Sequence, residues 1–547
     1  MLQPKRVSLM VQKNFRSRWN PSARLTRLSR GCLTILLCAS GSTAFADDGT
    51  LSDSGLNRAG LTSVWFTASG ISSGGKIVDW TLNVNENKST NYFVVKAGTY
   101  REIISQNNLS PFGMPYGLDG GVEYIETRKE VLEAELKSEG RADVKVITEQ
   151  FSLPKSTIYI LGNNGILTSI DADSGHQDWS VGVGSVNLPG VGIGASNDHV
   201  AAVNGSSLYC IEAATGKVLW SQQCKFGVAT SPAVSADHIY VPLLNGRMEI
   251  FEISKKGLGS YVLVAGGTGT ARPLVGESTV SWSTDKGELN VSASTGTRQH
   301  SIRFRLLASD AILNAPTMMD DLIFATSLDG FVYAIEEKGS LAWEFSTGAP
   351  ISQSPFVLNN SVYAITDDKE MFRFDARNGD VQWPKPLLKV NRFIGASKDR
   401  IYVTDDFDSL LVIDPKSAAI LSRVEIGDVR FALPNKQTDR LYVASRTGVI
   451  QCIHELGSPN PYFHETELVV TEPTKSPATP KPDKATGSDS AVAAEDDPFK
   501  TLDPSTATDQ EKPQPAVEDE DDPFATGSDK KKADDPVDDP DDDPFGG

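Results

Sequence analysis

Long apolar runs are almost absent from this sequence, and histidine is scarce. One run, Cys32 to Ala46, comes near the length of a membrane span, but its 15 residues are too few to cross a bilayer comfortably. No other segment is apolar for long enough, so a protein with several membrane spans is excluded. The six histidines form no metal-ligand motif, and we predict no metal site.

Cysteine occurs five times, and Cys32 and Cys38 lie in the N-terminal run. The remaining Cys210, Cys224 and Cys452 are too few for a disulfide framework. They are either small buried residues in strands or, for one pair, a bridge between Cys210 and Cys224.

The first 46 residues have the features of a targeting segment. Eight Lys and Arg residues between Lys5 and Arg30 precede the apolar run, no acid is present, and the run ends in Ala44-Phe45-Ala46. These features are typical of a secretory signal peptide. We expect residues 1–46 to be removed after secretion across the inner membrane, which leaves the mature chain in the periplasm or associated with the outer membrane. An uncleaved anchor is the alternative.

Negative charge dominates the rest of the chain. The net charge is −19 at pH 7, and removing the eight basic residues of the leader leaves −27. A chain so acidic repels a phosphate backbone, so no nucleic acid is expected as a partner. About half of this charge lies in residues 471–547, where 22 acids face eight lysines.

A glycine followed four residues later by a tryptophan recurs along the chain. The turns that carry these glycines repeat every 39–43 residues up to Gly457, and each unit contains two strand-like runs such as "IYILG" and "ILTSIDA". A period near 40 predicts a repeat architecture rather than several unrelated domains. The four complete pairs are Gly175 and Trp179, Gly216 and Trp220, Gly339 and Trp343, and Gly379 and Trp383.

Glycine and tryptophan have separate roles in this frame. A hairpin turn needs a residue at positive φ, which glycine accepts because it lacks a Cβ atom. The tryptophan then lies in the outer strand, where a flat indole fills the wedge between diverging sheets and docks one blade on the next. Eight units predict an all-β, eight-bladed propeller with four-stranded antiparallel blades over residues 151–465.

The pattern IYxxxxxGxLxxIDAxTGxxxW resembles the quinoprotein-type, or PQQ-like, β-propeller repeat. Residues 158–179, 200–220, 322–343 and 361–383 match it best. The chain is also similar to the propeller lipoproteins of the bacterial outer-membrane β-barrel assembly machinery, although it lacks their lipid-anchor motif. This resemblance implies a non-enzymatic, monomeric scaffold that binds envelope proteins and is peripheral to the membrane at most.

The alternative implied by the same resemblance is a PQQ-dependent dehydrogenase. Alcohol-oxidising members bind the quinone with calcium beside a disulfide between adjacent cysteines, and this chain has neither a Cys-Cys pair nor a matching Glu, Asn and Asp set. We therefore predict no cofactor and no catalytic residue. The recurrent turn acids are interpreted as local hydrogen-bonding groups; they are Asp171, Glu212, Glu336, Asp375 and Asp414.

Polar residues precede the predicted first strand of several units. They stand in "ATSPAV", "NAPTMM" and "SQSPFV". Because those strands would be innermost, these residues would rim the central channel, either as turn-forming residues or as contacts for a ligand or peptide. The candidates are Thr230, Ser231, Asn314, Gln353 and Ser354.

Residues 47–150 precede the repeats. "SVWFTASG" and "KIVDWTLNV" are predicted to complete the blade begun by residues 440–456 and so to tie the chain ends together. The segment from Val122 to Gly140 predicts a helical insertion on one face. Its apolar residues at helical spacing are Val122, Ile125, Val131, Leu132 and Leu136.

Residues 466–547 predict a disordered, acidic, proline-rich tail. Little apolar surface is available there to offset the entropy of ordering. Even so, Asp-Asp-Pro-Phe occurs three times and ends at Phe499, Phe524 and Phe545. These repeats are either linear motifs that bind multivalently or parts of a solvating spacer.

Overall fold

The computed structural model describes residues 50–464, apart from residues 72–74, 142, 257–258, 295–300, 408, 426–428, 446–447 and 459 and the side chains of residues 429–432. The predicted signal peptide and the predicted tail, with Phe499, Phe524 and Phe545, lie outside the described residues.

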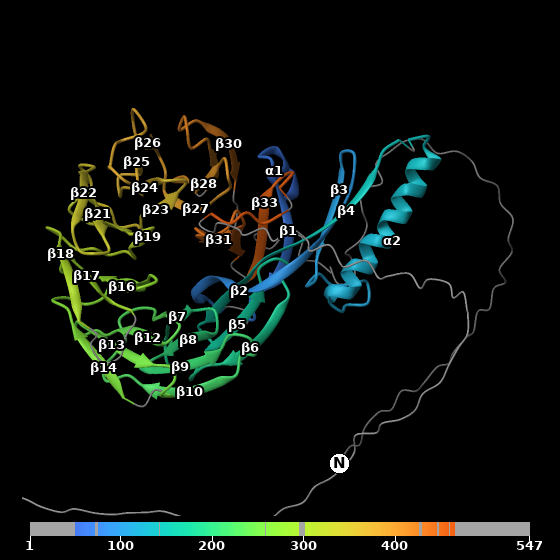
Figure 1. Ribbon diagram of the computed structural model, residues 1–547. Coiled ribbons are helices and arrows are strands. Elements are labelled where there is room, and N and C mark those ends of the chain that lie inside the picture. Colours follow the sequence, from blue (N-terminus) through green and yellow to red (C-terminus); the bar gives the residue numbers. More distant parts are fainter. Residues whose placement is uncertain are drawn as a thin grey trace, which may run out of the picture. The chain divides into compact units, whose positions relative to one another are not determined.

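The described residues form two helices and 33 strands in eight sheets (Figure 1). Seven sheets have four strands and the first has five, and neighbouring strands are antiparallel. The predicted all-β propeller class with four-stranded antiparallel sheets is therefore confirmed, with sheet 1 as the exception.

The first four sheets follow chain order. Sheet 1 contains β2 (Ile77–Ala97), β3 (Tyr100–Ser105), β4 (Val146–Gly162), β5 (Ile166–Asp171) and β6 (Gln177–Gly182). Sheet 2 contains β7 (Gly190–Ala195), β8 (His199–Asn204), β9 (Ser207–Glu212) and β10 (Val218–Gln223). Sheet 3 contains β11 (Ala233–Val234), β12 (His238–Pro242), β13 (Arg247–Glu252) and β14 (Ser260–Val264). Sheet 4 contains β15 (Leu274–Val275), β16 (Thr279–Ser283), β17 (Glu288–Ala293) and β18 (Ile302–Leu307).

Sheets 5 to 7 also follow chain order, and sheet 8 combines the last three described strands with β1. Sheet 5 contains β19 (Thr317–Met319), β20 (Leu322–Thr326), β21 (Phe331–Glu336) and β22 (Leu341–Ser346). Sheet 6 contains β23 (Phe356–Leu358), β24 (Ser361–Ile365), β25 (Glu370–Asp375) and β26 (Leu387–Leu388). Sheet 7 contains β27 (Arg392–Ala396), β28 (Ile401–Thr404), β29 (Ser409–Ile413) and β30 (Ile420–Glu425). Sheet 8 contains β31 (Val429–Leu433), β32 (Leu441–Ser445), β33 (Val449–Glu455) and β1 (Leu61–Ala68), and the helices are α1 (Asp53–Arg58) and α2 (Gly117–Ser138).

Buried apolar clusters join each sheet to the next, and one of them joins sheet 8 to sheet 1. Tyr159 of sheet 1 and Ile193 of sheet 2 share one cluster, and Tyr442 of sheet 8 and Ile160 of sheet 1 share another. Because this series of contacts returns to its start, the eight sheets close a ring.

The middle strands of the sheets account for the unbroken apolar runs in the repeats. β12 and β20 are buried at every residue, whereas the outer strand β18 alternates between half-buried and exposed residues. A middle strand lies between two neighbouring sheets and buries both faces. An outer strand at the rim of the ring buries only one, and it keeps the alternating pattern.

The first and last described strands meet in sheet 8, where β1 pairs with β33 and Trp65 lies opposite Cys452. The prediction that "KIVDWTLNV" joins the same sheet is wrong, because this segment lies in β2 and pairs with β4 of sheet 1. The chain thus passes from the outer strand of sheet 8 to the inner strand of sheet 1. The same step links the other neighbouring sheets.

β2 and β4 continue beyond sheet 1 and carry an inserted structure. Residues 77–85 pair with residues 155–162 inside the sheet, and residues 89–97 pair with residues 146–154 beyond it. On this outer half, Phe93 shares a buried cluster with Ile125 and Leu132 of α2, which Figure 1 shows beside β3 and β4. We call residues 86–154 the arm. β4 crosses residue 150 without a break, so the N-terminal region and the first repeat share one sheet.

The helix of the arm is longer than the predicted one, because α2 begins at Gly117 rather than at Val122. Leu132 is buried and Leu136 packs against the same cluster. The core position expected for Val131 is wrong, since this side chain is 41% exposed. Leu132 already occupies the buried face, and its neighbour in sequence points about 100° away around the helix.

Candidate functional site

The tryptophans of the repeat frame lie between sheets. Three of them donate their indole N–H to a carbonyl in the turn of the following sheet, and each of these carbonyls comes one residue after the turn acid. Trp179 donates to Ala213 O, Trp343 to Ala376 O and Trp383 to Pro415 O, each at 2.9 Å. Trp65 of β1 does the same to Ala172 O at 3.1 Å, so sheet 8 contacts sheet 1 in the same way.

Each turn glycine lies under the indole of the preceding sheet rather than under the tryptophan of its own frame. A Cβ atom on Gly175 would lie 2.5 Å from the Trp65 ring, and one on Gly216 would lie 2.6 Å from the Trp179 ring. Gly379 would meet Trp343 at 2.7 Å in the same way. These glycines therefore meet two requirements at once, a positive φ of 72–76° and the absence of a side chain.

Not every junction has this pattern. Gly339 has φ 104° and lies against Phe304, because β18 of sheet 4 has a phenylalanine where sheets 1, 2, 5, 6 and 8 have tryptophan. The indole N–H of Trp220 has no hydrogen-bond partner among the described residues. The turn that follows it includes residues 257–258, which lie outside the description.

The predicted rim residues lie where sheets 3, 5 and 6 begin, and the first strands of several neighbouring sheets contact one another. Ser231 donates to Asp79 Oδ2 at 2.7 Å. Asn314 Nδ2 donates to Thr326 O at 3.0 Å, and Gln353 Nε2 donates to Asn391 O at 2.7 Å. Three of the five residues therefore bond to protein groups at sheet starts or within their own sheet. Thr230 and Ser354 are half-buried beside them.

An ion pair that the sequence analysis missed connects sheets 1 and 4. Arg272 Nη2 lies 2.7 Å from Asp79 Oδ2 and 3.1 Å from Trp80 O. The same carboxylate oxygen accepts from Ile193 N at 2.9 Å and from Ser231 Oγ. Asp79 thus gathers donors from sheets 2, 3 and 4. The signal was present in the sequence, since Arg272 precedes a proline just as Ser231 and Ser354 do.

A lysine makes a comparable link among sheets 5, 6 and 8. Lys436, in the loop between β31 and β32, donates to Thr317 Oγ1 at 3.0 Å and to Pro355 O at 2.8 Å. Thr317 itself donates to Pro355 O at 2.8 Å. The polar groups at the sheet starts are therefore largely bonded to one another, which favours a role in holding the ring together.

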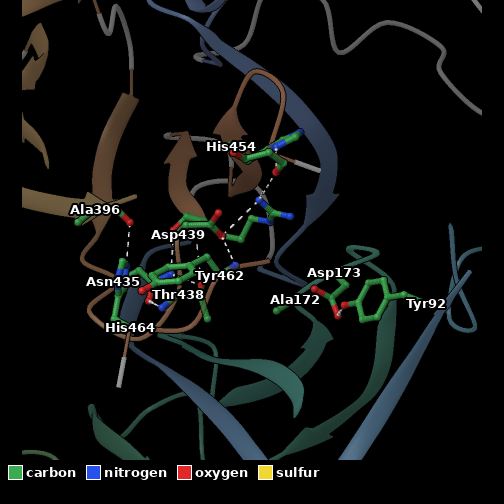
Figure 2. Close-up of polar contacts among 12 residues, drawn as sticks. Tyr92, Ala172, Asp173, Ala396, Asn435, Thr438, Asp439, His454, Tyr462 and His464 are labelled. Atoms are coloured by element: carbon green, nitrogen blue, oxygen red, sulfur yellow. Dashed lines mark hydrogen bonds and ion pairs between the residues drawn. The ribbon is translucent and has the colours of Figure 1, made fainter. Parts of the chain in front are cut away.

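A third polar cluster lies where the chain leaves sheet 8, as Figure 2 shows. We call residues 456–464 the strap. Arg440 is buried, with Nη1 3.3 Å from both Asp439 Oδ1 and Ser458 O. Asp439 Oδ1 accepts from Tyr462 N at 3.0 Å, and Asp439 N donates to Tyr462 O at 2.9 Å. These contacts hold the strap on sheet 8.

The strap also contacts the arm. Phe463 is buried in a cluster with Tyr92 of β2 and Leu153 of β4, and Arg101 of β3 donates to Asn460 Oδ1 at 3.0 Å. The strap therefore joins sheet 8 to the base of the arm.

Two aspartates of the first repeat turn complete this joint. Tyr92 of the arm donates its hydroxyl to the Asp173 carboxylate, and Asn107 Nδ2 donates to Asp171 Oδ2 at 2.9 Å. Burial, and then the neighbouring Asp171, raise the pKa of Asp173 to about 7. Burial, with Arg440 nearby, lowers the pKa of His454 to about 4. The carboxylates are bonded to groups of the arm, so the cluster is a structural joint with titratable members.

The three cysteines outside the predicted signal peptide are free and buried, so the structure contains no bridge between Cys210 and Cys224. Burial raises the pKa of both thiols to about 12. A thiol with so high a pKa is a poor nucleophile at neutral pH. Among the described residues, no group of three or more His, Cys, Asp or Glu side chains is arranged to hold a metal.

Exposed apolar side chains gather on the loops that follow the outer strands of sheets 1 and 2 and on the hairpin between β12 and β13 of sheet 3. Leu188 lies against Gly205, Cys224 N bonds to Ser206 O, and Leu244 lies against Gly227 and bonds to it through the backbone. Arg247 covers the Phe226 ring at 5.6 Å. We call the exposed side chains of these neighbouring loops the ring-end patch; they are Val186, Leu188, Phe226 and Leu244.

Comparison with known proteins agrees with the repeat pattern. A family model described as "Outer membrane protein assembly factor BamB" matches residues 163–285 and 277–389. The chain resembles the BamB-type PQQ-like propellers.

Curated BamB relatives match at low identity. Outer membrane protein assembly factor BamB of Shewanella oneidensis is 23% identical over 308 residues, which cover 55% of this chain and 69% of that protein. The BamB of Moranella endobia is 20% identical and covers 56% of this chain and 84% of its own length. The BamB of Yersinia pestis is 25% identical and covers 43% of this chain and 67% of its own length.

Two solved structures are also similar. The crystal structure of BamB from Moraxella catarrhalis has 17% identity and a TM-score of 0.44, and it covers 55% of this chain and 91% of its own. The computationally designed Ika8 protein has 12% identity and a TM-score of 0.43. The match of the BamB family model begins at residue 163, so it does not include the arm, residues 86–154. In the part of the chain that the structure describes, no helix is both long enough and apolar enough to span a membrane.

Proposed function

We propose that this protein is a non-enzymatic scaffold of the cell envelope that binds protein partners during outer-membrane protein assembly. The names of its BamB relatives support this role. The structural observation that carries it is the ring-end patch, because clustered apolar side chains on loops are typical of protein-binding surfaces. Lys225 and Arg247 beside Phe226 and Leu244 give the patch a basic margin.

The test is cross-linking and affinity capture of the full chain from cell envelopes. A variant of the ring-end patch is compared with the wild type and with a control variant elsewhere on the ring. Phe226→Ser with Leu244→Ser should abolish recovery of an outer-membrane assembly component and leave the melting temperature unchanged. Phe407→Ser is the control, since Phe407 is 77% exposed on the loop between β28 and β29 of sheet 7, away from the patch. Equal recovery by all three proteins would remove the patch from the proposal.

A PQQ-dependent dehydrogenase is the competing class, and it has a direct assay. Purified protein supplied with PQQ and calcium should show no dye-linked oxidation of alcohols or sugars. Turnover above that of the protein without PQQ would overturn the scaffold role as the main function.

A further inference from the structure

The loop between β3 and α2 carries the most exposed large apolar side chain among the described residues. Phe112 is 92% exposed, and Met114 is 67% exposed two residues later. Leu118 and Leu109 are 50% and 44% exposed on either side. We call residues 106–117 the arm loop. Single exposed apolar residues are ordinary, but three on one short loop with a fourth, Leu118, at the start of α2 are typical of a binding surface.

Backbone hydrogen bonds give the arm loop a fixed shape. Ser110 N donates to Met114 O at 2.7 Å, and Tyr116 N donates to Asn108 O at 3.0 Å. Leu109 and Pro115 form a β-bridge between these bonds. Gly113, at φ 79°, makes the reversal between Phe112 and Met114. The loop is therefore a small hairpin with apolar side chains at its tip.

Side chains brace this hairpin against both the arm and the ring. The Tyr116 ring packs on the Tyr124 ring of α2, with 5.1 Å between centroids. Tyr124 bonds to Glu102 of β3, and Asn107 bonds to Asp171 of sheet 1. A surface that is already ordered loses less conformational entropy when it binds. The position of Phe112 is thus fixed before a partner binds, as expected of an anchoring residue.

Charge narrows the kind of partner. The helix that follows the loop, α2, contains six acids against three bases. All six acids are exposed; they are Asp119, Glu123, Glu126, Glu130, Glu133 and Glu135. Anionic lipid headgroups would be repelled by this surface. A protein surface with basic residues around an apolar pocket would be attracted to it.

We propose that the arm loop inserts Phe112 and Met114 into an apolar pocket of a partner protein, and that basic residues at the rim of this pocket meet the acids of α2. This contact is separate from the ring-end patch, so the scaffold would hold partners at two places. The arm that carries this loop is itself fixed to the ring, by the hydrogen bonds of Tyr92 and Asn107 and by the strap.

The experiment uses photocross-linking in intact envelopes, with a photoreactive phenylalanine analogue in place of Phe112 in the full chain. Val131, exposed elsewhere on α2, takes the analogue in the control. We expect a discrete adduct with another protein from position 112 and none from position 131. Met114→Ser with Leu118→Ser should lower the adduct yield about tenfold, as for loss of an anchoring contact. Glu123→Lys with Glu126→Lys, or high salt, should lower it as well.

Several results would overturn the proposal. These are equal yields from positions 112 and 131, an adduct within residues 465–547 of the same chain, or an adduct with a second copy. Binding of the purified protein to vesicles rich in phosphatidylglycerol, lost in Phe112→Ser, would assign the loop to a membrane instead. The Phe226→Ser, Leu244→Ser variant separates the two surfaces, because it should keep the adduct at position 112 even if the ring-end patch has no partner.

Discussion

In the ring, one contact recurs at three junctions, with an indole of one sheet packed on the turn glycine of the next; among the described residues of the arm, no such contact is repeated. The Trp65, Trp179 and Trp343 junctions share the same bond to the turn carbonyl. The arm instead has one helix, one three-stranded extension and one strap, each with its own contacts. Repetition favours stability in the ring, whereas the unrepeated arm leaves apolar side chains such as Phe112 and Met114 exposed.

This difference predicts that replacing a large side chain by alanine lowers the free energy of unfolding much more in the ring than in the arm. Trp383→Ala removes an indole that is 2% exposed and bonded to Pro415 O, and it should lower the free energy of unfolding by about 3–5 kcal/mol. Phe112→Ala in the arm removes a side chain of similar size from the surface and should change stability by less than about 0.5 kcal/mol. Denaturant unfolding of both variants measures the difference. Similar values for the two would mean that the junctions do not dominate ring stability.

A smaller change at a junction sharpens the same comparison. Gly216→Ala places a methyl group 2.6 Å from Trp179 at a φ of 73°, so overpacking and backbone strain should together cost about 2–4 kcal/mol. The matched control is Ala418→Gly, because Ala418 occupies the equivalent turn at φ 59° and already carries the methyl group beside Trp383. That exchange should stay within about 1 kcal/mol of the parent. Thermal melts of both proteins provide the test.

The joint between arm and ring should respond to pH. The folded-state pKa of Asp173 is about 7, well above its ordinary value, so the folded protein binds this proton more tightly than the unfolded chain does. Stability should therefore fall as pH rises from the ordinary aspartate pKa, about 4, to about 7, and level off above pH 7. Asp173→Asn should flatten this fall. Melting temperatures between about pH 6.5 and 8.5 measure the end of the fall and the level part that follows it.

The pH window matters because the strap histidines act in the opposite direction. Burial lowers the pKa of His454 to about 4 and also lowers that of His464, so both cost stability as pH falls below about 6.5. Asp439 and Tyr92 also lie near Asp173 and have raised pKa values; burial raises both, and Asp173 itself contributes to the raised pKa of Tyr92, so that contribution is lost in the variant. A wild-type slope equal to that of Asp173→Asn above pH 6.5 would contradict the assignment.

The sequence allowed the ring to be predicted because its signal is repeated. The period, the buried runs and the positive-φ glycines all follow from local rules, and Gly175, Gly216, Gly339 and Gly379 do have positive φ. The sequence did not predict that a turn glycine contacts the tryptophan of the preceding sheet, because the spacing is equally compatible with contact to the tryptophan of its own repeat.

The candidate contacts were harder to predict than the fold. Asp79 and Arg272 are 193 residues apart, and only ring closure brings them to 2.7 Å. The arm loop has no periodicity at all, and its residues are those of an ordinary turn. Phe112 becomes a candidate binding residue only once the structure shows the hydrogen bonds that order the hairpin around it.

The predicted tail is expected to give the smallest effect on stability. Residues 472–547 lie outside the described residues, and their acidic, proline-rich composition leaves little apolar surface to bury, so deleting them should shift the melting temperature hardly at all. If the three Asp-Asp-Pro-Phe repeats are binding motifs, single Phe499, Phe524 or Phe545 to Ala changes should weaken partner capture mildly, and the triple change severely, as multivalent binding requires. Unchanged capture by the triple variant would leave the tail a spacer. A large drop in melting temperature on deletion would mean instead that the tail docks on the ring or the arm, and the arm loop would then have a competing partner within the same chain.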